Sequence, residues 1–231
     1  MKKLFDKNDY ISDNNKKVLF LEMTFTKLKN KAKIYPLFKL EDVFKWFPEA
    51  NRQVTLNQLN FWCQKGELEN IRRGIYKLSD FGFKDSFILA NFIYSPSYIS
   101  LETALNYYSI IPDVPFAITS VSVNKTKTFK TKNYGVFSYS SIKPDLFFSF
   151  KSILVEKNYA YNIASPEKAL FDYLYLRPKK IDSVEGFIEE LRLSLPKNFN
   201  WQNFKKWIEL VPKRNKNFHN CFKFLVKKYG K

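Results

Sequence analysis

The sequence has 231 residues, of which 45% are hydrophobic, and this is enough apolar material for a folded core rather than a disordered chain. Lysine and arginine number 39 against 22 aspartates and glutamates, so the formal net charge is +17. An excess of this size favours polyanionic partners and says nothing about the fold. The length predicts one large or two small domains, and we expect two, at residues 1–82 and 83–231.

Neither the apolar runs nor the N-terminal segment nor the cysteines indicate a membrane protein or a secreted protein. No stretch approaches the roughly 18 apolar residues that a membrane span requires, and charges interrupt the N-terminal MKKLFDKNDY before an apolar run can form. Cys63 and Cys221 lie in apolar helical contexts and have neither a metal-ligand spacing nor the pattern of a disulfide framework. These features predict a cytoplasmic protein with reduced thiols and no membrane partner.

The first 82 residues contain three helical patterns followed by a hairpin. Apolar residues at helical spacing predict helices over 16–30, 38–48 and 54–66. Two short β-type runs then flank Arg72-Arg73-Gly74, a three-residue hairpin loop that ends in glycine. Three helices and a hairpin are typical of a winged helix-turn-helix domain, in which the third helix can enter the DNA major groove.

The third predicted helix presents polar side chains on the side away from Leu59 and Trp62. Amides can pair bidentately with adenine, threonine can contact a base or a phosphate, and arginine can bind guanine or a phosphate. Gln64 is expected on this side as well. The predicted DNA-binding residues of the helix and the hairpin are Arg52, Gln53, Thr55, Asn57, Gln58, Asn60, Arg72, Arg73 and Lys77. The alternative interpretation is that these polar side chains are only solvated.

The remainder of the chain mixes strand and helix patterns. From 87 to 106 the pattern predicts two helices joined at Ser95-Pro96-Ser97, with Ser100 as the N-cap of the second. Alternating residues over 117–129 and 134–142 predict an antiparallel hairpin. The predicted fold class is therefore α+β, with a winged helix-turn-helix domain followed by a mixed α/β domain.

The later part of this second domain is predicted to be helical. Ser165 as a cap, Pro166 at the first helical position and Glu167 in the first turn form the strongest helix start in the chain. Three further helices are predicted over 183–195, 201–211 and 218–229. They make residues 179–231 an all-helical C-terminal region.

This C-terminal region is the most basic part of the sequence. Its cations fall largely opposite the apolar stripe of the helices, so they could form one basic face. The predicted members of this face are Lys205, Lys206, Lys213, Arg214, Lys216, Lys223, Lys227 and Lys228. Phosphates or an acidic partner would suit such a face, and an ordinary solvated surface is the alternative.

Signals for catalysis are weak. His219 is the only histidine, which excludes histidine-dependent triads and multi-histidine metal sites, and the six glycines form no phosphate-binding loop. Glu102, Asp145, Glu167 and Asp172 could hold Mg²⁺, but Glu167 and Asp172 are expected on different faces of one helix. We predict no catalytic residues, no metal and no cofactor.

Two other function classes remain open at this point. One is a Mg²⁺-dependent nucleic-acid-processing or nucleotidyl-transferring enzyme that uses the carboxylates. The other is a protein-interaction module whose basic tail binds an acidic partner.

Three segments in order resemble the AbiEi family of antitoxins from bacterial abortive-infection toxin–antitoxin systems of type IV. They are GELENIRRGIYKL at 66–78, SYISLETALNYYSIIP at 97–112 and IASPEKALFDYLYL at 163–176. The resemblance covers roughly residues 38–178. The N-terminal 15 residues and the richness in lysine, asparagine and phenylalanine depart from the family's character.

The resemblance implies a winged-helix domain followed by an α+β antitoxin domain. It implies a repressor that binds double-stranded DNA at the operator of its own operon and counteracts a nucleotidyltransferase-like toxin, with or without direct contact. Carried onto this chain, the operator-reading surface would be the third helix with Arg72 and Arg73. Glu167 and Lys168 would be exposed, at least in part, on the scaffold of the antitoxin domain.

Overall fold

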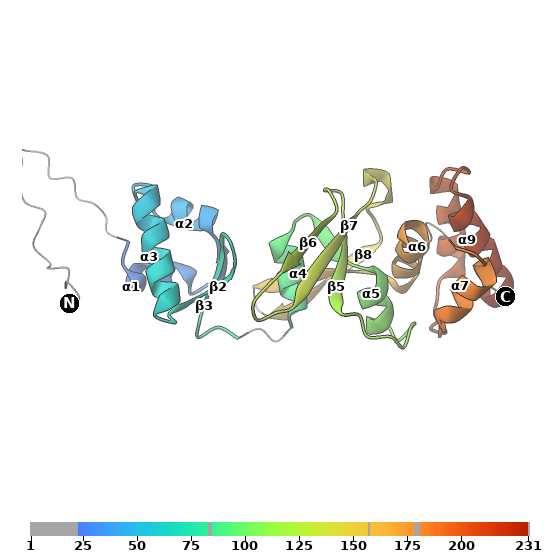
Figure 1. The fold of residues 1–231 in the computed structure, drawn as a ribbon, viewed down its shortest axis with the longest axis horizontal. Helices are drawn as coiled ribbons and strands as arrows, with labels where there is room; N and C mark the ends of the chain where they lie inside the picture. Colours follow the sequence, from blue (N-terminus) through green and yellow to red (C-terminus); the bar gives the residue numbers. More distant parts are fainter. Residues whose placement is uncertain (1–22, 83–84, 157, 178–180, 231) are drawn as a thin grey trace, which may run out of the picture.

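The protein folds as a mixed α+β chain in three parts that lie in a row, as Figure 1 shows for the computed structural model. The structure describes residues 23–82, 85–156, 158–177 and 181–230. We call 23–82 the N-terminal unit, 85–177 the central unit and 181–230 the C-terminal helices. The expected domain boundary after residue 82 adjoins residues outside the described ranges, and so does the part of the first expected helix that precedes residue 23.

The N-terminal unit packs three helices on a small antiparallel sheet of strand order β1-β3-β2. Its elements are α1 (Phe25–Ala32), β1 (Leu37–Lys39), α2 (Leu40–Trp46), α3 (Arg52–Gln64), β2 (Leu68–Arg72) and β3 (Ile75–Leu78). The predicted helices and hairpin are confirmed with shifted ends. The start of the expected helix over 38–48 was wrong, because Leu37–Lys39 pairs with β3 as a strand before α2 begins.

The central unit contains a mixed sheet of strand order β6-β7-β5-β4-β9-β8. Its elements are α4 (Phe87–Ile93), β4 (Ser97–Ile99), α5 (Leu101–Tyr107), β5 (Ala117–Ser122), β6 (Lys127–Lys130), β7 (Val136–Ser141), the 3-10 turn η1 (Pro144–Leu146), β8 (Phe150–Glu156), β9 (Tyr159–Ala164) and α6 (Pro166–Leu176). The expected hairpin is confirmed for β6 and β7, whereas β5 pairs in parallel with β7. Strands β4, β8 and β9 were not predicted.

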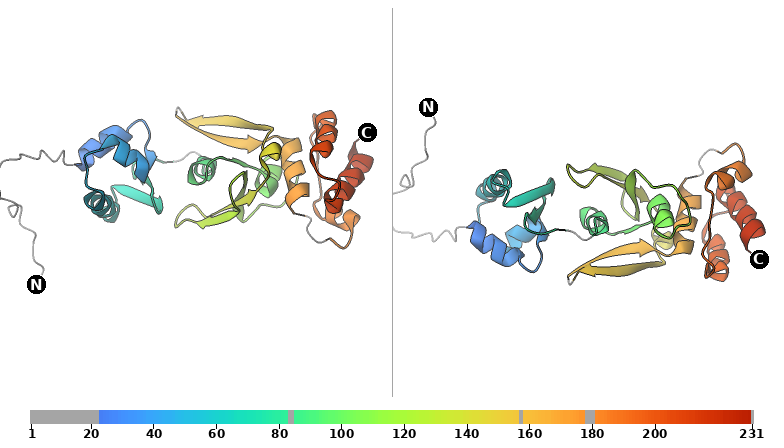
Figure 2. Two further views of the ribbon diagram at one scale, coloured as in Figure 1. Left: turned by 90° about the horizontal axis from the view of Figure 1, so that it is seen from above. Right: turned by 90° about the horizontal axis from the view of Figure 1, so that it is seen from below.

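The sheet of the central unit curves so that its two outer hairpins, β6–β7 and β8–β9, lie on either side of α4 (Figure 2). The turns of both hairpins face the N-terminal unit. Helix α6 lies between the sheet and the C-terminal helices. The two hairpin turns are therefore the parts of the central unit placed to hold the N-terminal unit.

Helix α6 begins as predicted, with the Ser165 side chain accepting a hydrogen bond from the Lys168 N–H. The expectation that Glu167 and Lys168 are exposed was wrong, because both are buried. A Glu167 carboxylate oxygen accepts the backbone N–H of Asn200 at 2.7 Å, so the C-terminal region covers it. The Lys168 ammonium pairs with the Asp172 carboxylate one turn later in the same helix.

The Lys168–Asp172 pair is completely buried and is the most unusual charged feature of the interior. The hydroxyls of Tyr98 and Ser100 donate to Asp172 at 2.9 and 2.8 Å. The Lys168 ammonium also lies over the Phe148 ring, 4.7 Å from its centroid. Burial lowers the pKa of Lys168 and raises that of Asp172, and their mutual attraction opposes both shifts. The cluster ties α6 to β4 and to the start of α5.

The C-terminal helices pack on the outer side of α6. They comprise α7 (Val184–Glu190), α8 (Trp201–Lys206), the 3-10 turn η2 (Trp207–Leu210) and α9 (Lys216–Tyr229), so the first two predicted helices are shorter than expected. Ring contacts such as Phe171 with Phe218, at 5.2 Å between centroids, join them to the central unit. Cys63 and Cys221 are free thiols. Among the helices of the described ranges, none combines the length and the apolar character required to cross a bilayer.

Candidate nucleic-acid interface

Helix α3 is fixed in the N-terminal unit by its cap and by one apolar face. The Asn51 side chain accepts the backbone N–H groups of Gln53 and Val54, which satisfies two donors at the helix start. Leu59 and Trp62 are buried in the core of the unit. Because this face is anchored, the opposite face of α3 is presented to solvent.

The exposed face of α3 carries a row of amide side chains. Gln53, Asn57, Asn60 and Gln64 are all exposed, and at about 100° per residue they fall within about 60° of one another around the helix. The Gln53 amide donates to the Asn57 carbonyl oxygen at 3.1 Å, which orders the first two. We call these four residues the amide row. They include three of the predicted DNA-binding residues together with Gln64.

Two further predicted residues flank this row at the helix start and side. Arg52 is exposed, and its guanidinium lies 5.1 Å from the Phe44 ring centroid, so α2 orients it. Gln58 is half-buried and, at about 100° per residue, lies at least about 100° around the helix from each member of the row. The structure therefore groups Gln53, Asn57 and Asn60 on one accessible face of α3, with Arg52 exposed at the helix start and Gln58 outside the row.

Thr55 does not belong to this surface, and its predicted DNA contact is wrong. The residue is 1% exposed because it lies on the same side of α3 as Leu59 and Trp62, at the i, i+4, i+7 spacing of the buried face. Within the described residues its hydroxyl has no hydrogen-bond partner. A buried hydroxyl of this kind is a cost to folding rather than a site for DNA.

Replacing Thr55 with valine is expected to raise the free energy of unfolding by about 1 kcal/mol, because the isosteric methyl needs no hydrogen bond. Urea denaturation of the wild type and the variant measures this difference. Thr55→Ser keeps the hydroxyl and removes a methyl, so it serves as the control and should be destabilising. A valine variant less stable than the wild type would mean that the hydroxyl has a partner.

The structure separates the two arginines of the hairpin, because Arg72 is the last residue of β2 and only Arg73 and Gly74 form the loop, one residue fewer than predicted. Arg73 is exposed, whereas Arg72 is half-buried with its guanidinium 4.0 Å from the Phe129 ring centroid in the central unit. Gly74 has a φ of +80°, a value that suits glycine. The expected pair of outward guanidinium groups is therefore wrong for this conformation, and Arg73 is the hairpin cation that faces solvent.

Lys77 is also not available to DNA, contrary to prediction. It is 5% exposed, and its ammonium binds the Glu69 carboxylate at 3.0 Å and the Phe81 carbonyl oxygen at 2.8 Å. All four residues of β3 are buried. The side chain is enclosed because β3 is the middle strand of the small sheet and one face of that sheet is turned to the central unit.

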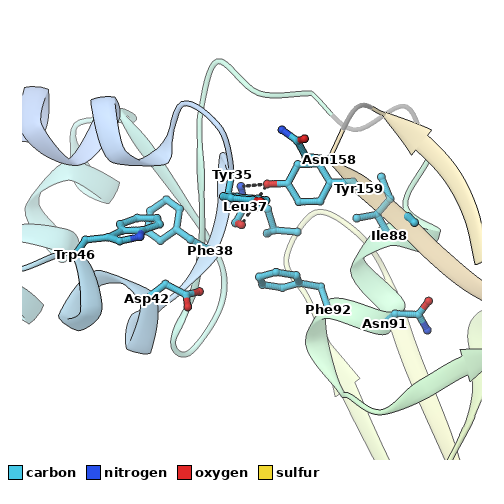
Figure 3. A pocket seen from close by; sticks show the side chains of 11 residues that line it. Tyr35, Leu37, Phe38, Asp42, Trp46, Ile88, Asn91, Phe92, Asn158 and Tyr159 are labelled. Atoms are coloured by element: carbon cyan, nitrogen blue, oxygen red, sulfur yellow. Dashed lines mark hydrogen bonds between the residues drawn. The ribbon is translucent and has the colours of Figure 1, made fainter.

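Both hairpin turns of the central unit bind the N-terminal unit. From the β6–β7 turn, Asn133 and Tyr134 donate to Glu69 at 2.7 and 2.9 Å. From the first residue of β9, next to the β8–β9 turn, the Tyr159 hydroxyl accepts the Leu37 N–H at 2.9 Å and donates to its carbonyl oxygen (Figure 3). These contacts fix the direction in which α3 presents its amide row.

A cleft of about 540 Å³ lies beside the Tyr159 contact (Figure 3). Trp46, Phe38 and Asp42 line it from the N-terminal unit, and Phe92 and Tyr159 line it from the central unit. Asp42 accepts the Lys39 N–H at 2.9 Å, which caps α2. The cleft marks where the two units meet without complete packing.

Glu69 makes the contact between the units sensitive to acid. Desolvation raises the pKa of its carboxyl, but hydrogen bonds from Asn133, Lys77 and Tyr134 outweigh this effect, so the pKa lies below its ordinary value of 4.5. A lowered pKa in the folded state means that the carboxylate stabilises the fold above that ordinary value. The contribution is lost as the pH falls through the lowered pKa.

We therefore expect wild-type protein to lose more unfolding free energy than a Glu69→Gln variant as the pH is lowered below the ordinary carboxyl pKa of 4.5. The glutamine keeps two hydrogen-bonding atoms but does not titrate, so it is the matched control. Urea denaturation at a series of pH values gives the comparison. Parallel pH profiles for the two proteins would show that Glu69 does not contribute in this way.

The predicted basic residues of the C-terminal region are all exposed, from Lys205 to Lys228. Three lysines gather around a hollow of about 480 Å³ that also includes His219 and Glu209; they are Lys213, Lys216 and Lys223. Two others have protein partners, since Lys205 donates to the Gly230 carbonyl oxygen and Lys228 pairs with Glu189 at 2.9 Å. Binding of phosphates or of an acidic partner by this face stays a prediction.

The carboxylates considered for Mg²⁺ are dispersed among separate contacts. Glu102 forms a bidentate pair with Arg177 at 2.5 and 2.8 Å, Asp172 binds Lys168, and Glu167 accepts a backbone N–H. Asp145 is exposed in η1. Across the described ranges, no three histidine, cysteine, aspartate or glutamate side chains are grouped in a way that could hold a metal ion.

Comparison with known proteins adds no assignment to this geometry. No family model matches the chain, and no curated protein matches it.

Proposed function

We propose that the protein is a DNA-binding repressor of its own operon and an antitoxin, with the N-terminal unit as a winged helix-turn-helix domain. The observation that carries the DNA-binding part is the exposed amide row of α3 within an element order of α1, β1, α2, α3, β2 and β3. This order, with an antiparallel sheet flanking three helices, is that of winged-helix domains, in which the third helix lies in the major groove.

The charge supports a duplex as the ligand. The net charge of +17 favours association with phosphates over the whole molecule. Two guanidinium groups of the N-terminal unit are exposed near this surface. Arg52 directly precedes the first residue of the amide row, and Arg73 lies in the hairpin loop. We assign them to phosphate contacts, and the amides to base edges.

The antitoxin part rests on the resemblance of the three sequence segments to the AbiEi family. Two of these segments build β4 with α5 and the helix α6, which are joined by the buried Lys168–Asp172 cluster. The partner implied by the resemblance is a nucleotidyltransferase-like toxin encoded beside this gene.

DNA binding is tested by selecting duplexes from a random pool with the purified protein and then measuring affinity by fluorescence anisotropy over a series of salt concentrations. We expect enrichment of a defined sequence and a log–log salt slope of about −0.9 for each phosphate contacted. An unenriched pool, or an affinity independent of salt, would contradict the repressor.

The antitoxin role is tested separately, by co-expressing the protein with the product of the adjacent gene and measuring growth. Rescue of growth by the wild type is expected. Toxicity that persists despite stable expression of both proteins would contradict the antitoxin role without bearing on DNA binding.

A further inference from the structure

Two large apolar side chains are exposed on α3 beside the amide row. Val54 is 53% exposed and Phe61 is 49% exposed. They are seven residues apart, so they lie nearly above one another along the helix, about 60° to 100° from the centre of the amide row. Sequence reasoning missed both, because it considered only polar residues for base contacts.

The surroundings of Phe61 suit a polyanion rather than a protein core. The Lys65 ammonium lies 4.5 Å from the Phe61 ring centroid, so a cation stands directly beside the exposed ring. The amide row adjoins on one side, with Asn57 and Asn60 between the two apolar residues along the helix. An apolar protein partner would have to cover this cation and the amide groups of the row, at a desolvation cost.

In the major groove, thymine presents a C5 methyl group, and adenine presents the N7 acceptor and N6 donor that an amide pairs with. A surface with amides on one stripe and apolar side chains on the next therefore complements A·T base pairs on both of their groove features. Resting on the proposed DNA-binding function, we propose that Val54 and Phe61 contact thymine methyl groups and that the protein prefers A·T-rich operators.

The test removes the methyl groups without changing base pairing. A duplex selected by the protein is prepared with thymine or with uracil at each A·T position of the selected site, and the two affinities are compared by anisotropy. Burial of one CH₂-sized group corresponds to about a fourfold change in affinity, so loss of two methyl contacts should weaken wild-type binding by about fifteenfold.

The matched variants assign this effect to the two side chains. In the Val54→Ala, Phe61→Ala double variant the thymine-to-uracil ratio should fall to about one, because the partners of the methyl groups are gone. Phe116→Ala, which removes a ring that is 93% exposed in the central unit, should keep the wild-type ratio.

Three outcomes would overturn the inference. Equal wild-type affinity for both duplexes means that methyl groups are not read, while the proposed DNA binding stands. A ratio that persists in the double variant assigns the methyl contacts elsewhere. If the only difference is that the wild type sediments as a dimer and the double variant as a monomer, this face is a contact between copies of the chain. Absence of any selected duplex instead refutes the proposed function itself.

Discussion

Replacing Asp172 with alanine is expected to lower the free energy of unfolding by about 3–5 kcal/mol. The Lys168 ammonium would remain at 0% exposure without its counter-charge, and an unpaired buried charge is among the costliest defects in a fold. The hydroxyls of Tyr98 and Ser100 would also lose their acceptor. Since whole domains are stable by only about 5–15 kcal/mol, we expect the variant to retain little stability at about 37 °C.

The control for this prediction removes both charges and keeps the shape. In the Asp172→Asn, Lys168→Met double variant, the asparagine carbonyl still accepts from Tyr98 and Ser100, and methionine fills the aromatic surroundings of the lysine stem. We expect it to recover most of the lost stability, as replacement of buried ion pairs by neutral groups often does. A double variant as unstable as Asp172→Ala would assign the loss to packing instead of to the stranded charge.

Introducing two carboxylates into the amide row is expected to weaken binding to a selected duplex by about a hundredfold or more. Gln53→Glu with Asn57→Asp is nearly isosteric, but it removes the amide donors to the bases, each worth about 1–3 kcal/mol, and places negative charge toward phosphates. Both residues are exposed, so thermal stability should be almost unchanged. Anisotropy titrations and thermal melts of the same preparations give the two numbers.

The matched control for this variant changes the net charge equally at the other end of the molecule. Asn198→Asp with Gln202→Glu alters two exposed residues of the C-terminal helices. A comparable loss of affinity in the control would assign the effect to the overall charge, or to a duplex bound along the basic C-terminal face, and would contradict readout by α3.

Local patterns in the sequence predicted the elements that depend on local signals. Ser165, Pro166 and Glu167 start α6 where expected, and Gly74 ends the hairpin loop where expected. Thr55 could also have been placed correctly, since it stands at helical spacing from Leu59 and Trp62. It was misplaced because its polar chemistry was given more weight than its position on the helix.

Features that depend on contacts distant in sequence could not be read in this way. Lys77 is buried because the strands on both sides of β3 and the central unit surround it. Arg72 is turned from solvent by Phe129, a residue more than 50 positions later in the chain. Nothing in the local sequence of the hairpin distinguishes Arg72 from Arg73, so only the fold separates their roles.

Side-chain footprinting with hydroxyl radicals, in the presence and absence of a selected duplex, tests most directly whether α3 reads DNA. Val54 and Phe61 are exposed and lie beside the amide row. Phe116 is an exposed phenylalanine of the central unit and serves as an internal reference. The proposal predicts that modification of Val54 and Phe61 slows when the duplex binds, while that of Phe116 does not change. A bound duplex that leaves both α3 residues as reactive as in the free protein would contradict it.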